Sequence, residues 1–239
     1  MDLELVEILQ GSFSLVFTII TVIIGIRICF RFFEKKNREY LLIGLSWIGM
    51  ALAWASDSLS FLSIIFLNTP ISEALYFMIS VGFLPFVLII WLFAWTDLVW
   101  KEKQKIILIL TIIFSIIYEI MFWYLLFTDI TQIGKFLGYF HVEYGLVVII
   151  PAMVVIVVFF ITGLIFSFHS IKSDDALINL RGKLFLIAII LFTVGAILDS
   201  SVPLLPITVV ITRLILISSS ISFYFAYMMP AWVKKIFIK

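Results

Sequence analysis

Long runs of apolar residues, separated only by short polar or charged segments, fill almost the whole sequence. A helix needs about 20 apolar residues to cross the hydrocarbon core of a bilayer, and these runs have that length. They are apolar on all faces of a helix, whereas the strands of a membrane β-barrel alternate between apolar and polar residues. Apolar residues make up 64% of the chain and charged residues 13%, more hydrocarbon than a soluble domain can bury. We therefore predict an all-α integral membrane protein, with residues 1–239 forming a single domain.

A bundle of seven transmembrane helices accounts for these runs. The predicted spans cover residues 12–32, 40–67, 72–95, 106–127, 144–168, 183–202 and 207–229. The first residues include Asp2, Glu4 and Glu7, whereas a secretory signal begins with basic residues. We therefore expect the first apolar run to be retained as a span.

The basic residues predict how the helices are oriented. Of the sixteen Lys and Arg residues, fourteen fall on one side of the predicted spans. They are Arg27, Arg31, Lys35, Lys36, Arg38, Lys101, Lys103, Lys105, Lys172, Arg181, Lys183, Lys234, Lys235 and Lys239. Cytoplasmic loops of membrane proteins carry an excess of Lys and Arg, so this side is predicted to be cytoplasmic. The protein would then be a multi-pass protein of the cell membrane, with the N-terminus extracellular and the C-terminus cytoplasmic.

Spans one to three and spans five to seven resemble each other in their arrangement. The second helix of each triplet carries an aspartate close to its outer end, Asp57 in one and Asp199 in the other. A proline, Pro70 or Pro206, then precedes or opens the third helix, a position where its missing N–H is tolerated. This pattern predicts a parallel repeat of three, one and three spans, related by an axis along the membrane normal.

Four ionisable residues fall within the predicted spans, all in the outer half: Asp57, Glu119, Asp199 and Arg213. Such side chains cost several kcal/mol in hydrocarbon unless they are paired or hydrated, so each is a candidate functional residue. One interpretation is a polar pocket open to the outside, in which Arg213 recognises an anionic ligand. The other is a structural ion pair of Arg213 with Asp199 or Asp57. The sequence leaves both open.

Several chemistries have no support in the sequence. A retinal protein needs a lysine in the middle of its last span, and none is there. A zinc hydrolase needs several converging histidines, whereas His141 and His169 stand at opposite ends of the fifth span. Asp57 and Asp199 are the only candidate pair for an intramembrane aspartyl hydrolase, which is a minority hypothesis. We therefore expect no enzymatic activity, no metal, no cofactor and no nucleic-acid partner.

Three features resemble the seven-span N-terminal sensor region of archaeal and bacterial histidine kinases. They are the basic loop at residues 33–38, the proline-marked turn before the third span, and the stretch from Asp199 to Trp232. The resemblance implies a receptor-like role and transfers no binding residue. This sequence departs from that pattern because only residues 230–239 follow the last span, which leaves no output domain. The layout of three, one and three spans also looks like the SWEET family of sugar transporters, although the prolines that break those helices are missing here.

We therefore expect a sensor-like or receptor-like protein with an outward-facing pocket for a small ligand. Its signal would reach a cytoplasmic partner through the inner loops, of which residues 171–183 form the longest. The alternative is a transporter for a small solute, coupled or not to protons. A transporter needs polar groups accessible from both sides, and the charges here are biased outward. The ligand and the oligomeric state are not readable from the sequence.

Overall fold

The computed structural model describes residues 3–203 and 205–237. Asp2 of the acidic N-terminal segment and Lys239 of the predicted cytoplasmic basic residues lie outside the described residues. The chain is almost entirely helical, with one short β-hairpin. The elements are α1 (Leu5–Lys35), α2 (Arg38–Met50), α3 (Leu52–Leu67), α4 (Glu73–Phe77), the π-helical turn η1 (Met78–Gly82), α5 (Leu84–Val99), η2 (Lys101–Lys103), α6 (Gln104–Thr128), η3 (Ile130–Gln132), β1 (Gly134–Phe136), β2 (Val142–Tyr144), α7 (Leu146–Ile171), α8 (Ala176–Ser201), α9 (Pro206–Met228) and α10 (Ala231–Phe237).

Six helical stretches are long and apolar enough to cross a membrane. They are α1, residues 73–99, residues 101–128, α7, α8 and α9. The pair α2 and α3 passes the same test together, although its two halves meet at an angle of 53°, and counting it as one span gives seven. These features confirm an all-α, multi-pass membrane protein whose exposed apolar side chains contact the bilayer.

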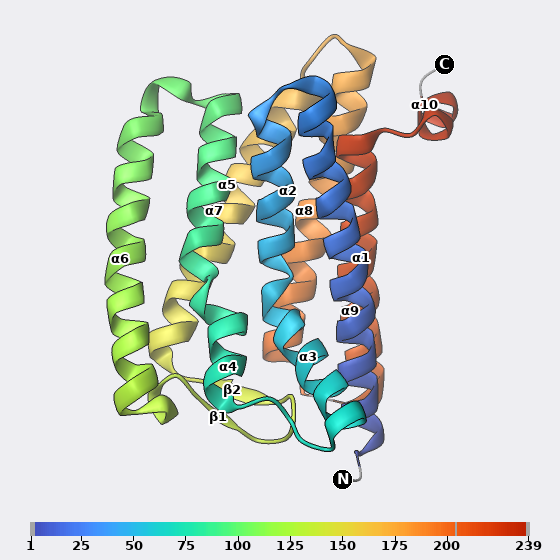
Figure 1. Cartoon of the computed structure of the whole chain (residues 1–239). Helices are drawn as coiled ribbons and strands as arrows, with labels where there is room; N and C mark the ends of the chain where they lie inside the picture. Colours follow the sequence, from blue (N-terminus) through green and yellow to red (C-terminus); the bar gives the residue numbers. More distant parts are fainter. Residues whose placement is uncertain (1–2, 204, 238–239) are drawn as a thin grey trace.

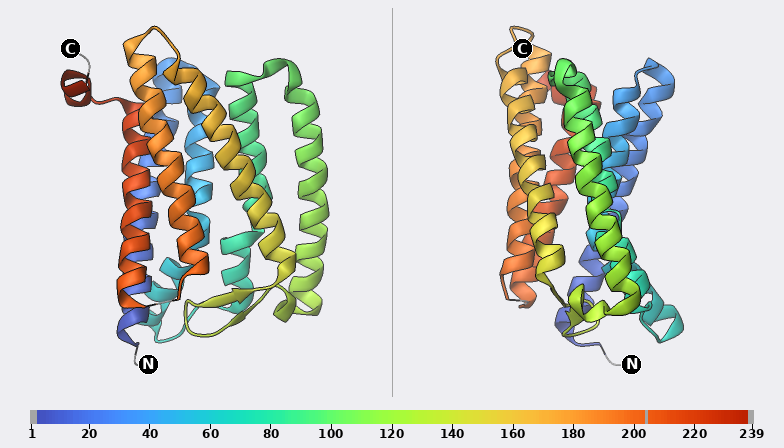
Figure 2. Two further views of the ribbon diagram at one scale, coloured as in Figure 1. Left: turned by 180° about the vertical axis from the view of Figure 1, so that it is seen from behind. Right: turned by 90° about the vertical axis from the view of Figure 1, so that its left-hand side faces the viewer.

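The spans form a closed ring with one helix outside it. Around the ring, α1 packs against α2, α2 against α5, α5 against α7, α7 against α8, α8 against α9, and α9 returns to α1. Helix α6 packs along α5 and stands at the edge of the bundle (Figures 1 and 2). The fourth span is therefore peripheral to the other six.

The two ends of the bundle differ in their connections. One end carries residues 36–37, 100–103 and 172–175 together with α10, and we call it the basic end. The other, the hairpin end, carries the start of α1, residues 68–72 and the β-hairpin (Figure 1). The described basic residues of the predicted cytoplasmic set lie at or near the basic end. Helix α1 begins at the hairpin end, and α10 lies at the basic end (Figure 1).

Pro85 explains why the span at residues 73–99 is interrupted. A proline inside a helix has no N–H to donate, and its ring clashes with the carbonyl group four residues earlier. That carbonyl belongs to Val81, within the π-helical turn η1 that separates α4 from α5. The Val81 oxygen instead accepts a hydrogen bond from the Tyr118 hydroxyl of α6, at 3.1 Å. The interruption thus helps to hold the peripheral helix.

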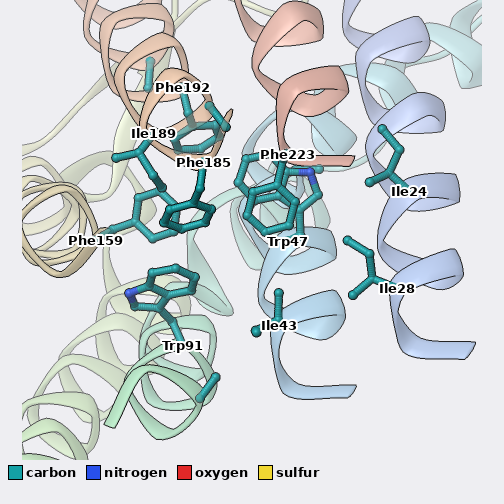
Figure 3. Packing of buried hydrophobic residues seen from close by; sticks show 14 of the residues in the cluster. Ile24, Ile28, Ile43, Trp47, Trp91, Phe159, Phe185, Ile189, Phe192 and Phe223 are labelled. Atoms are coloured by element: carbon teal, nitrogen blue, oxygen red, sulfur yellow. The ribbon is translucent and has the colours of Figure 1, made fainter. Parts of the chain in front are cut away.

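An aromatic core fills the middle of the ring. We give this name to Trp47, Trp91, Phe159, Phe185, Phe192 and Phe223, all nearly inaccessible to solvent (Figure 3). They come from α2, α5, α7, α8 and α9. The rings of Trp47 and Phe223 stack with centroids 3.6 Å apart, and Trp91 lies 4.5 Å from Phe159. This packing joins five spans in one aromatic cluster.

Two glycines bring α1 and α2 into backbone contact. A Cβ atom at Gly44 would lie 2.6 Å from the carbonyl oxygen of Gly25 and 2.5 Å from the sulfur of Cys29. Small residues at such positions allow membrane helices to approach closely.

We predict that Gly44→Ala destabilises the protein by about 1–3 kcal/mol, because the added methyl group overpacks this crossing. Gly138→Ala in the hairpin is the matched control, since its Cβ would meet no atom closer than 3.4 Å. Unfolding of the purified protein in detergent measures both variants. Equal stability of the Gly44→Ala variant and wild type would contradict this account of the crossing.

Candidate functional site

Arg213 stands at the centre of a buried polar cluster near the hairpin end. Its residue surface is 1% exposed. Its Nη2 atom lies 3.5 Å from Oδ2 of Asp57 on α3, and its Nη1 atom pairs with Oδ1 of Asp199 on α8. The guanidinium of α9 therefore connects the two aspartates that the sequence pattern had matched.

The carboxylate of Asp57 receives hydrogen bonds from two further spans. The hydroxyl of Ser14 on α1 donates to Oδ2 at 3.1 Å, and the hydroxyl of Tyr76 on α4 donates to Oδ1. Both oxygens are thus occupied, and the side chain is buried. Helices α1, α3, α4, α8 and α9 all contribute a group to the cluster.

Asp199 is held by two neighbours besides Arg213. The indole N–H of Trp54 donates to Oδ2 at 2.9 Å, and the hydroxyl of Thr212 donates to Oδ1 at 3.4 Å. The guanidinium also lies 5.9 Å from the centre of the Trp54 ring, within reach of a cation–π contact. The Asp199 side chain is 18% exposed against 6% for Asp57, so it is the more accessible carboxylate.

The β-hairpin is bonded to this cluster. The carbonyl oxygen of Phe140, between the two strands, accepts a hydrogen bond from Gln10 of α1 at 3.0 Å and lies 3.4 Å from the hydroxyl oxygen of Tyr76. The N–H of Tyr139 donates to the Glu7 carboxylate at 3.3 Å. Tyr76 therefore contacts both Asp57 and the hairpin, and it connects the charged cluster to the segment that crosses this end of the bundle.

The charges of the cluster do not balance by ion pairing alone. One guanidinium faces two carboxylates, and neutral donors from Ser14, Tyr76, Trp54 and Thr212 supply the remaining hydrogen bonds. The Nε atom of Arg213 is buried and has no hydrogen-bond partner within the described residues. The guanidinium therefore retains a donor for an additional acceptor.

Three of the four predicted site residues meet here, and the fourth does not. Glu119 lies on the peripheral helix α6, where its carboxylate accepts a hydrogen bond from Trp123 at 2.9 Å. Asp57 and Asp199 each contact their own nitrogen of Arg213. This arrangement differs from an aspartyl hydrolase, in which two carboxylates share one proton directly.

Sequence reasoning missed several members of the cluster. Ser14, Trp54 and Tyr76 were not among the predicted site residues, and Gln10 lies before the predicted start of the first span. Ser14 and Gln10 are polar residues of the largely apolar helix α1, which is a usable signal. Tyr76 and Trp54 carry no such signal, because aromatic residues are common in membrane helices.

We predict that Arg213→Ala lowers the free energy of unfolding by about 3–5 kcal/mol, because it leaves two carboxylates buried without their cation. A triple variant removes the three charges together, and its free energy of unfolding should fall by less than that of Arg213→Ala. Its substitutions are Asp57→Asn, Asp199→Asn and Arg213→Met. Unfolding in detergent compares the two. If Arg213→Ala is as stable as wild type, the buried cluster is not an energetically coupled unit.

The described residues include no group of three or more His, Cys, Asp or Glu side chains arranged to hold a metal ion. The chain matches no family model, and comparisons with curated proteins and with solved structures gave no significant match.

Proposed function

We propose that this chain is a sensor-like membrane protein in which Arg213 recognises a small anionic ligand. The observation that carries the proposal is a buried guanidinium shared between carboxylates of two spans, whose Nε donor has no partner among the residues that the structure describes. An anion with planar oxygens, such as a carboxylate, matches the donor geometry of a guanidinium.

In this proposal, the ligand exchanges with Asp199 on the guanidinium. Asp199 is the more exposed of the two carboxylates, at 18% against 6% for Asp57, and one of its two other donors, the Thr212 hydroxyl, lies as far away as 3.4 Å. Exchange would release the Trp54 indole and alter the contacts of Thr212 on α9. Helices α8 and α9 pack closely and run to the basic end, so they provide a physical route for a signal to a partner at the 172–175 connection.

Formate tests this exchange. The Asp199→Ala variant lacks the side-chain carboxylate, and formate has nearly the same size and the same charge as that missing group. We expect formate to raise the unfolding temperature of Asp199→Ala more than that of wild type. Neutral formamide, which has nearly the same shape, should have no such effect. The Asp199→Asn variant is the matched control, since its amide fills the space. Lack of rescue by formate would count against an anion site that the solution can reach.

The orientation that goes with this proposal places the hairpin end outside the cell and the basic end in the cytoplasm. The support is the concentration of Lys and Arg at the basic end.

We predict that a membrane-impermeant maleimide labels Gly138→Cys on intact cells, and labels Asp174→Cys only after the cells are permeabilised. Both variants are made in a Cys29→Ser background, because Cys29 is the single cysteine. Gly138 lies in the hairpin and Asp174 in the connection before α8. The reverse labelling pattern would refute the orientation and the outward-facing site.

A second candidate function is transport of a small solute, and interruptions in two spans favour it. Transporter sites are commonly built where membrane helices are discontinuous. Here α2 and α3 meet at 53°, and η1 interrupts the next span, with Asp57 and Tyr76 on the hairpin side of these breaks. The peripheral α6 also fits a layout of three, one and three spans. Flux of nitrate in proteoliposomes that Asp57→Asn abolishes would favour transport over sensing.

A further inference from the structure

A cavity of about 140 Å³ lies at the basic end, between α2, α5, α7, α8 and α9. Its walls include the rings of Tyr40, Phe166, Phe185 and Tyr227. Helix α8 contributes Arg181 to this cavity and Asp199 to the cluster at the hairpin end. These two residues are 18 positions apart in the same helix, which corresponds to about 27 Å. The cavity is therefore a separate site.

Two charged side chains, Glu39 and Arg181, line the cavity, and they differ in their hydrogen bonding. The Glu39 carboxylate accepts a hydrogen bond from the side-chain amide of Asn37 at 3.0 Å. Arg181 has no hydrogen bond or ion pair in the part of the chain that the structure describes, and its Nε atom is buried. A buried N–H of a guanidinium without an acceptor is unfavourable, so an acceptor inside the cavity would be bound strongly.

The surroundings of the cavity favour an anion. The basic end carries thirteen described Lys and Arg side chains, while its acidic residues are Glu34, Glu39, Asp97, Glu102, Asp174 and Asp175. Such an excess of positive charge raises the local concentration of anions. The cavity is also close in size to an apolar cavity of about 150 Å³ that accommodates a benzene ring. Size, aromatic walls and charge thus point to one class of molecule.

We propose that this cavity binds a small organic monocarboxylate. The carboxylate would pair with Arg181, and an aromatic or branched apolar body would pack against Phe166 and Phe185. Glu39 would exclude a second negative charge, because two carboxylates in one small cavity repel each other. The site is distinct from Arg213, and its existence does not depend on the proposed sensor function.

Three probes of equal size separate the charge requirement from the shape requirement. Benzoate, neutral benzamide and cationic benzamidine are titrated into the purified full-length chain in nanodiscs, with binding followed by ligand-observed NMR. Benzoate should bind at least tenfold more tightly than benzamide, and benzamidine should bind most weakly. Glu39→Gln should strengthen benzoate binding, because it removes the negative charge that the described residues place in the cavity wall.

Variants show whether the signal comes from this cavity. Arg181→Gln should weaken benzoate binding at least tenfold, while Lys172→Gln, which removes an exposed charge at the same end, should leave it unchanged. Benzoate binding that is lost in Arg213→Met but kept in Arg181→Gln would assign it to the other site and overturn the proposal. Preference for benzamidine, or no benzoate binding at millimolar concentration, would overturn it as well. Retained unfolding temperature shows that Arg181→Gln is folded.

Discussion

The guanidinium of Arg213 is almost completely removed from water, and a charge in that position is tolerated only when other groups replace its hydration. Carboxylates from α3 and α8 do so, and hydroxyl and indole donors from α1, α3, α4 and α9 satisfy those carboxylates in turn. Helices that are far apart in sequence must therefore meet at one point. The position of the hairpin follows from the same network, because Tyr76 contacts both Asp57 and Phe140.

Aromatic side chains make up much of the remaining bundle interior, and small buried hydroxyls such as those of Thr162 and Ser219 lie among them. Trp47, Phe159 and Phe223 belong to one buried cluster in the middle of the ring (Figure 3). Closely packed interiors have low compressibility and transmit strain. A displacement of α8 or α9 at one end of the bundle is therefore expected to move the same helix at the other end. A transporter needs polar groups that are accessible from both sides, whereas the charged cluster around Arg213 lies near the hairpin end, which favours the sensor hypothesis.

Much of the candidate site could be predicted from the sequence, and the residues that the prediction placed wrongly or missed have physical explanations. An ionisable residue in an apolar run is conspicuous, so Asp57, Asp199 and Arg213 could be singled out from the sequence. Glu119 was equally conspicuous but lies on α6, because residue depth does not tell which helices are neighbours in the ring. Tyr76 was missed because an aromatic residue in a membrane helix gives no polar signal. The bend of 53° at Ala51 also changes the direction of α3, so counting residues along a straight helix misjudges which side chains share a level.

The amino-acid sequence by itself determined that the chain is an all-α membrane protein, since the bilayer accepts only segments that satisfy their own backbone hydrogen bonds. It also determined the unequal distribution of Lys and Arg between the two ends. Only the tertiary structure decided that six spans close into a ring with α6 outside, that Arg213 bonds to both aspartates, and that Arg181 and Glu39 share a cavity. The reason is that hydropathy indicates how deeply a residue lies in the membrane. Which side chains contact each other depends instead on how each helix is rotated and bent relative to its neighbours.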